Sequence, residues 1–152
     1  MAEANFPVSP DTAVADLMEC LVIGYAYDAA EERFVFVSDF PLRPRGGDRT
    51  FLALVLAQVS SFKRIRGLRQ RTQGADTCYG ADEQTPPMVV QSVKLTDVPP
   101  RRGIQLWFGP AFGGIELEFA SIEAGLRETR AEQRSGTFVY RDIATGEPLD
   151  FF

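Results

Sequence analysis

The sequence contains no histidine. This absence excludes a Ser-His-Asp triad, a Cys-His nucleophile pair, imidazole ligands for zinc and a histidine pH switch. The two cysteines, Cys20 and Cys78, are too few for a disulfide framework, and in a reducing compartment both are thiols. We therefore assign no catalytic residue, and we expect neither a metal site nor a cofactor.

Long hydrophobic runs are also missing. No stretch approaches the ~20 apolar residues that a membrane-spanning helix needs, and the N-terminus lacks the basic flank and apolar core of a secretory signal. Hydrophobic residues make up 45% and charged residues 24% of the 152 residues, values that are typical of a soluble globular domain. We expect a cytoplasmic protein that does not bind membranes.

Lysine is scarce, because Lys63 and Lys94 are the only two among 16 basic residues. The preference for arginine indicates a GC-rich genome, and we expect a bacterial protein. The formal net charge is −5, so the surface as a whole is acidic and nucleic acid is an unlikely partner.

The clearest pattern present is a hairpin over residues 103–119. Ile115, Leu117 and Phe119 alternate with two glutamates, which places the apolar side chains on one face of a strand and the carboxylates on the other. The run before it places Ile104, Leu106 and Phe108 on one face, and Gln105 and Trp107 on the other. The glycine- and proline-rich connection between the two runs is typical of a turn.

Similar short runs occupy residues 21–27, 33–38, 51–57, 88–96 and 137–140. The run at 33–38 is apolar on both faces and so is expected to be central or covered on both sides. In total we predict an all-β fold, an antiparallel β-sandwich or partly closed barrel of about seven to eight short strands with little helix. Residues 1–11 are predicted to be a flexible arm, and residues 12–152 a single sandwich domain.

Three segments are ambiguous. Apolar residues recur every three positions over 59–68, which fits a bulge between two strand segments or a short helical turn, and we favour the bulge. Residues 72–87 are expected to form a long exposed loop. Residues 121–134 are expected to form a strand that gives way to a polar loop, the alternative being a helix, because Glu123 and Arg127 have the spacing of a helical ion pair. Residues 137–140 and 149–152 are expected to form a last hairpin.

A cationic stretch over residues 63–71 contains no acidic residue. Arginine presents a planar fork that suits carboxylates and phosphates, so the stretch is a candidate site for an acidic protein surface or a small anion. The alternative is a solvated strand edge on which cations discourage edge-to-edge pairing. The five basic residues are Lys63, Arg64, Arg66, Arg69 and Arg71.

Aromatic residues crowd the tip of the 103–119 hairpin, where Trp107, Phe108 and Phe112 lie close together in sequence. If Trp107 faces away from the apolar side of its strand, it has the properties of a protein-binding hot spot. The alternative is that a second layer covers it.

We therefore predict a non-catalytic module that binds another protein, of the inhibitor or immunity type or a subunit of a larger assembly, with homo-oligomerisation possible. The alternative is a hydrolase or a binding protein for a sugar or an anion, with Asp39, Glu116, Glu118 and Arg141 lining a cavity between sheets. Asp76, Asp82 and Glu83 match no calcium-binding loop.

Overall fold

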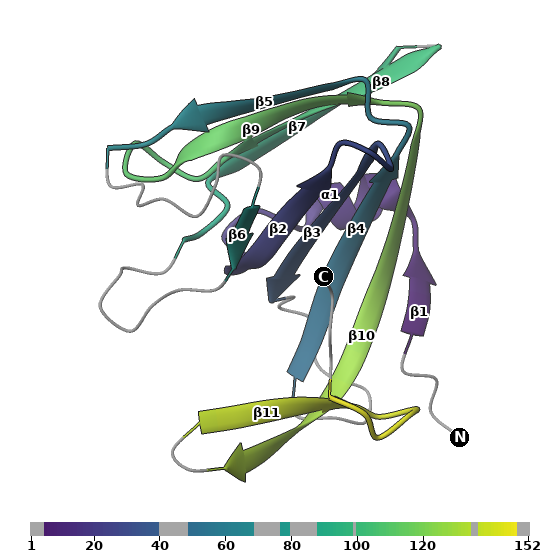
Figure 1. The fold of residues 1–152 in the computed structure, drawn as a ribbon, viewed down its shortest axis with the longest axis vertical. Helices are drawn as coiled ribbons and strands as arrows, with labels where there is room; N and C mark the ends of the chain where they lie inside the picture. The colour runs from purple at the N-terminus through teal and green to yellow at the C-terminus, as the bar shows by residue number, and fades with distance from the viewer. Residues whose placement is uncertain are drawn as a thin grey trace.

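The computed structural model describes residues 5–39, 49–68, 77–79, 88–98, 100–134 and 137–148. These residues form eleven strands in two antiparallel sheets, together with one helix of six residues, α1 (Pro10–Ala15) (Figure 1). The predicted all-β class with little helix is confirmed, and the described strands outnumber the predicted seven or eight. No helix in the described ranges is long and apolar enough to cross a membrane.

The large sheet has seven strands in the order β1-β10-β4-β3-β2-β6, with β11 also paired to β10. In chain order these are β1 (Asn5–Val8), β2 (Val22–Asp28), β3 (Arg33–Asp39), β4 (Arg49–Ala57), β6 (Thr77–Tyr79), β10 (Ser121–Arg134) and β11 (Thr137–Asp142). The small sheet has four strands in the order β5-β9-β8-β7. They are β5 (Ser61–Arg66), β7 (Ser92–Val98), β8 (Arg101–Trp107) and β9 (Gly113–Phe119).

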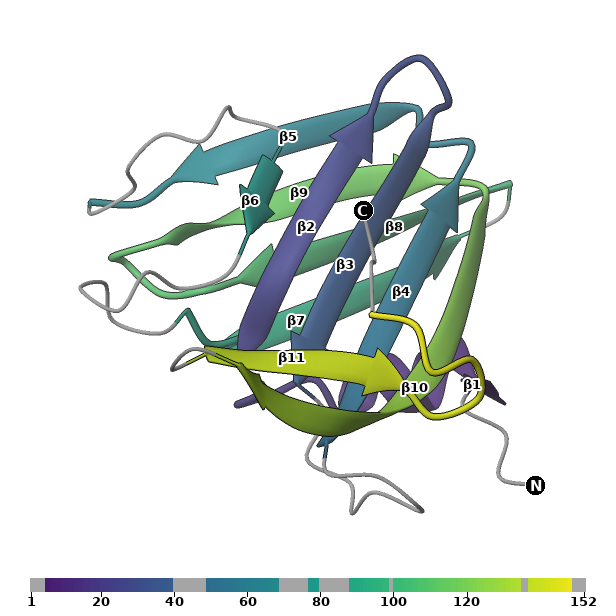
Figure 2. The same cartoon turned by 60° about the horizontal axis from the view of Figure 1, so that its bottom comes forward.

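The core lies between the two sheets, whose strands run across one another (Figure 2). It is built by the two-residue alternation of side chains along each strand. Alternate residues of β4 such as Leu54, and of β9 such as Leu117, are at most 2% exposed and belong to one cluster. The helix α1 joins this cluster through Ala13 and Val14. The predicted hairpin at 103–119 is confirmed as β8 and β9, with Ile104, Leu106 and Phe108 facing this core.

A corner joins the two sheets. There the chain passes from β4 to β5 and, beside it, from β9 to β10, so that both paired segments leave one sheet and enter the other. Ala57 pairs with Ser121 in the large sheet, and Ser61 pairs with Glu118 in the small sheet. Three residues, 58–60, therefore lie opposite two, 119–120. An extra residue therefore lies on one side of the pair at 58–60, where Gln58 has a φ of 52°. The predicted bulge does not account for the apolar recurrence over 59–68, because β5 pairs regularly from Ser61 to Arg66 and sets Phe62 and Ile65 on opposite faces.

The outer face of the large sheet carries a second apolar cluster around Val35, Val37 and Phe51. Tyr140 of β11 packs edge-on against Phe51, with ring centroids 5.4 Å apart. Since Val37 is 0% exposed and Phe36 on the other face is also 0% exposed, the prediction that this strand is covered on both sides is confirmed.

Several predicted boundaries need correction. The segment at 121–134 does not give way to a loop, because β11 pairs with its second half from Thr129 to Arg134. β7 begins at Ser92 rather than at residue 88, and Val89 makes only an isolated bridge with Leu21. Within the predicted 72–87 loop, Thr77–Tyr79 forms β6 beside β2.

The two chain ends also differ in detail from the expectation. Residues 5–8 of the predicted arm form β1, which pairs with residues 124–127 of β10. β11 pairs with β10, and Arg141 also makes an isolated antiparallel bridge with Pro148 across the turn that follows β11. Residues 149–152, the other half of the predicted last hairpin, lie outside the described residues.

Candidate interaction surface at one end of the small sheet

The two stretches predicted to bind a partner lie side by side. β5 pairs with β9 in a register that sets Lys63 opposite Glu116 and Arg66 opposite Gly113. The end of β5 therefore adjoins the connection between β8 and β9 (Figure 1). Pairing within one sheet joins segments of the chain that are about fifty residues apart, which the sequence pattern alone does not reveal.

Trp107 lies on the outer face of the small sheet, turned away from the core. It is half-buried, whereas its neighbours Leu106 and Phe108 are each 2% exposed. Trp107 pairs with Gly114 of β9, and its Cε3 would lie 3.0 Å from a Cβ placed on that glycine. The indole thus rests on the backbone of β9, and on the far side of Gly114 the half-buried Ile65 occupies the same row.

Leu68 extends the apolar surface beyond the end of β5. Its side chain is 89% exposed, and Met18 at 55% is the other large hydrophobic residue that is exposed in the described part of the chain. The Leu68 N–H donates to the carbonyl of the exposed Pro110 at 2.9 Å. We define the tip surface by four residues: Ile65, Leu68, Trp107 and Pro110.

The tip is held in place from behind by Arg64. Its Nε donates to the Tyr25 hydroxyl at 2.8 Å, and its Nη1 donates to the carbonyls of Ile65 at 2.6 Å and Gly114 at 2.5 Å. Its Nη2 donates to the carbonyl of Phe112 at 2.8 Å. One guanidinium thus links β2, β5, the last residue of the turn and the start of β9, which fixes the backbone under the tip surface.

The predicted partner-binding residues have different environments. Phe108 lies in the core, stacked on Phe36 with centroids 6.2 Å apart, and Phe112 is half-buried and packs against the core. Neither is part of the tip surface. Lys63 and Arg66 are exposed and Arg64 is half-buried, while Arg69 and Arg71 lie outside the described residues.

Both lysines of the chain lie in one cross-strand row of the small sheet. The register places Lys63, Glu116, Gln105 and Lys94 on successive strands, and Gln105 donates to the Glu116 carboxylate at 3.4 Å. Lys63 and Lys94 are exposed and stand on β5 and β7, the two edge strands. Lysines at such positions discourage the addition of another strand.

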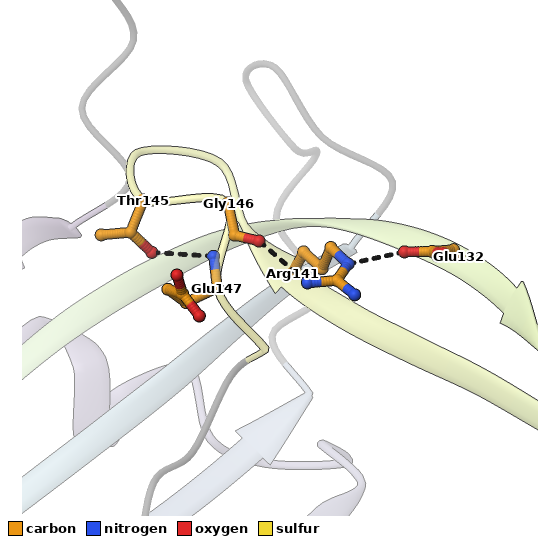
Figure 3. A network of polar contacts seen from close by, with 5 residues as sticks. All are labelled: Glu132, Arg141, Thr145, Gly146 and Glu147. Atoms are coloured by element: carbon orange, nitrogen blue, oxygen red, sulfur yellow. Dashed lines mark hydrogen bonds and ion pairs between the residues drawn. The ribbon is translucent and has the colours of Figure 1, made fainter.

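The four residues of the alternative hydrolase or ligand-binding hypothesis do not line a common inter-sheet cavity. Glu116 and Glu118 alternate with buried residues of β9 and face away from the core. Asp39 follows Val37 on the outer face of the large sheet. Arg141 binds the Glu132 carboxylate at 2.5 Å and the Gly146 carbonyl at 3.0 Å, beside a turn in which Glu147 N–H donates to Thr145 (Figure 3).

The two cysteines also lie apart from the tip surface. Cys20 is a buried free thiol that donates to the Asp16 carbonyl at 3.2 Å. Burial raises its pKa to about 11, with a further contribution from Asp39 and Asp16, so this thiol is not a ready nucleophile. Cys78 lies in β6, and Asp76, Asp82 and Glu83 lie outside the described residues.

Ile65 and Leu68 were not among the predicted site residues. Both belong to the recurrence of apolar residues at every third position over 59–68. The position of Leu68 directly after Gly67 is the signal that could have identified it. A glycine often ends a strand, and an apolar residue just beyond a strand end has no facing sheet to pack against. Gly67 itself packs against the backbone of Ala111 so closely that a Cβ would clash.

No family model, curated protein or solved structure matches the chain.

Proposed function

We propose that this chain is a non-catalytic module that binds another protein through the tip surface. The observation that carries the proposal is the 89% exposed Leu68, which is bonded to the turn that begins after the half-buried Trp107 at one end of the small sheet. Exposed apolar side chains that gather in one place are typical of interaction sites, and tryptophan is enriched among residues that dominate binding energy.

The rigidity of the tip supports the same proposal. Arg64 holds three backbone carbonyls around the turn, so little backbone freedom remains to be lost when a partner binds. Preorganisation of this kind increases affinity because the ordering cost is already met on folding.

The face of the sheet, rather than its edge, is the proposed contact. Lys63 and Lys94 occupy the exposed sides of the two edge strands, where they oppose strand addition. The proposed partner therefore packs against side chains. The source and compartment of the protein, predicted to be bacterial and cytoplasmic, remain expectations, as does the inhibitor or immunity role.

The test compares single variants of the tagged full chain in extracts of the source organism, with bound proteins quantified by mass spectrometry. Leu68→Ala and Trp107→Ala are each expected to reduce recovery of the partner about fivefold or more, because hot-spot truncation costs more than ~1 kcal/mol. Leu68→Ala is the sharper variant, since a side chain this exposed contributes little to folding.

Met18→Ala is the matched control, because it removes another exposed apolar side chain away from the tip surface. It is expected to retain the partner at the level of the unmodified chain. Equal recovery with Leu68→Ala and Met18→Ala, or no protein enriched above untagged resin, would contradict the proposal.

A further inference from the structure

Arg64 carries its positive charge among neutral groups. Its four hydrogen bonds go to one phenol hydroxyl and three backbone carbonyls. The side chain is half-buried, and among the described residues no carboxylate forms an ion pair with it. A partly desolvated cation without an opposite charge is costly, and such groups are normally paired.

Within the described part of the chain, these bonds leave one donor available. A guanidinium has five N–H groups. The bonds from Nε, from Nη1 to two carbonyls, and from Nη2 to Phe112 use four of them. The remaining N–H is on Nη2, on a guanidinium that is already fixed in orientation.

A second arginine lies on the same side of β5. Arg66 is two residues further along the strand, so alternation places it on the side of Arg64, about 7 Å away along the strand. Arg66 is exposed and pairs with Gly113, which has no side chain to obstruct it. Lys63 lies on the opposite, outer side of the same strand.

We propose that Arg64 and Arg66 form a binding site for an oxyanion, either a phosphate or a carboxylate. Arg64 supplies the fixed charge and the free Nη2 N–H, and Arg66 closes on the anion from the exposed side, because guanidinium groups form strong charge-assisted bonds with both oxyanions. The site goes beyond the tip surface, since Trp107 lies on the outer face of the sheet. The oxyanion is a free phosphate or an acidic side chain of a protein partner.

Thermal unfolding of the full chain tests the site, with inorganic phosphate titrated against sodium chloride at equal ionic strength. Phosphate is expected to raise the Tm of the unmodified chain by about 2–4 °C, with a rise that grows as the logarithm of phosphate concentration once the site is filled. Arg66→Gln is expected to lose most of this rise, and Lys63→Gln, which removes the same charge from the other side of β5, is expected to keep it. Arg64→Lys keeps the positive charge but removes the planar guanidinium group, and this variant is also expected to lose the phosphate-dependent rise in Tm.

A Tm rise that is no larger in phosphate than in chloride, or that is equal in Arg66→Gln and Lys63→Gln, would overturn the proposal. Glutarate, titrated in the same way, distinguishes the two sources. A rise at much lower phosphate than glutarate concentration supports a free phosphate, and comparable rises support a partner carboxylate. Leu68→Ala should not change either titration, so failure of the oxyanion site and failure of the tip surface are separable.

Discussion

Cys20 illustrates how burial sets the chemistry of a single residue. The thiol is 3% exposed, and its Sγ donates to the carbonyl of Asp16 one turn earlier in the chain. Because burial and the nearby Asp39 and Asp16 carboxylates all oppose formation of a thiolate, the pKa of Cys20 is raised from 9.0 to about 11. The folded chain therefore holds this proton more tightly than the unfolded chain.

The raised pKa predicts a loss of stability at alkaline pH. Below about pH 9 the thiol is protonated in both states and its contribution is fully present. As pH rises from about 9 to 11, only the unfolded thiol ionises, which favours unfolding. Relative to Cys20→Ala, the unmodified chain is expected to lose about 2 kcal/mol more unfolding free energy between pH 8 and pH 10.5, measured by urea denaturation. Equal losses in the two proteins would contradict the assignment.

Some site residues could be predicted one by one and others could not. The outward direction of Trp107 follows from two-residue alternation next to Leu106 and Phe108. The role of Arg64 does not follow from any local pattern, because its bonds reach Tyr25 across 39 positions and Gly114 across 50. In the sequence it is one of five similar cations.

At the scale of elements, the turn between β8 and β9 depends on glycine geometry. Gly113 has a φ of 76°, a conformation that side chains with a Cβ adopt at a cost. Its Cβ position is also occupied, because the carbonyl of Ile65 on β5 packs directly against it. Gly146, in the turn after β11, has a similar φ of 71° but has nothing within 4 Å of that position.

This pair of glycines gives a prediction with a built-in control. Gly146→Ala is expected to cost about 1 kcal/mol of unfolding free energy, since only the backbone conformation is strained. Gly113→Ala is expected to cost about 3 kcal/mol or more, because the added methyl group must also displace β5. Urea denaturation followed by circular dichroism measures both values, and equal costs would show that the close approach of β5 does not matter.

The strands themselves were predictable wherever one face is apolar. The runs predicted at 21–27 and 33–38 and the hairpin predicted at 103–119 form β2, β3, β8 and β9. In β9 the burial of one face imposes a period of two, whereas β3 is buried on both faces and was recognised by its continuous apolar run. The second half of β10 was missed for the corresponding reason. From Arg127 to Arg134 the sequence is polar on both faces, so the periodic signal disappears although pairing with β11 continues.

At the scale of the whole molecule, both sheets contribute to one core and share a corner. The core cluster contains residues of β2, β3, β4 and β10 from the large sheet and of β8 and β9 from the small sheet. Across the corner, Ala120 N–H donates to Ala57 and Ser60 N–H donates to Glu118, so the ladder continues from one sheet into the other. If one sheet unfolds, the inner face of the other sheet therefore becomes exposed to solvent.

The shared core predicts a single cooperative unfolding transition. Trp107 is the sole tryptophan and lies in the small sheet, so its fluorescence reports on that sheet, whereas far-ultraviolet circular dichroism reports on both. The two signals are expected to give the same urea midpoint. A lower midpoint for fluorescence would indicate that the small sheet unfolds by itself.

A single residue, Ala120, separates β9 from β10. This spacing decides which face of the sheet each side chain of β10 points to. One added residue would move each of the 14 side chains of β10 to the opposite face. Leu126 would then face outward and Arg127 inward. Natural variation in chain length should therefore accumulate in the turns and spare this junction, which fixes the direction of every side chain in β10.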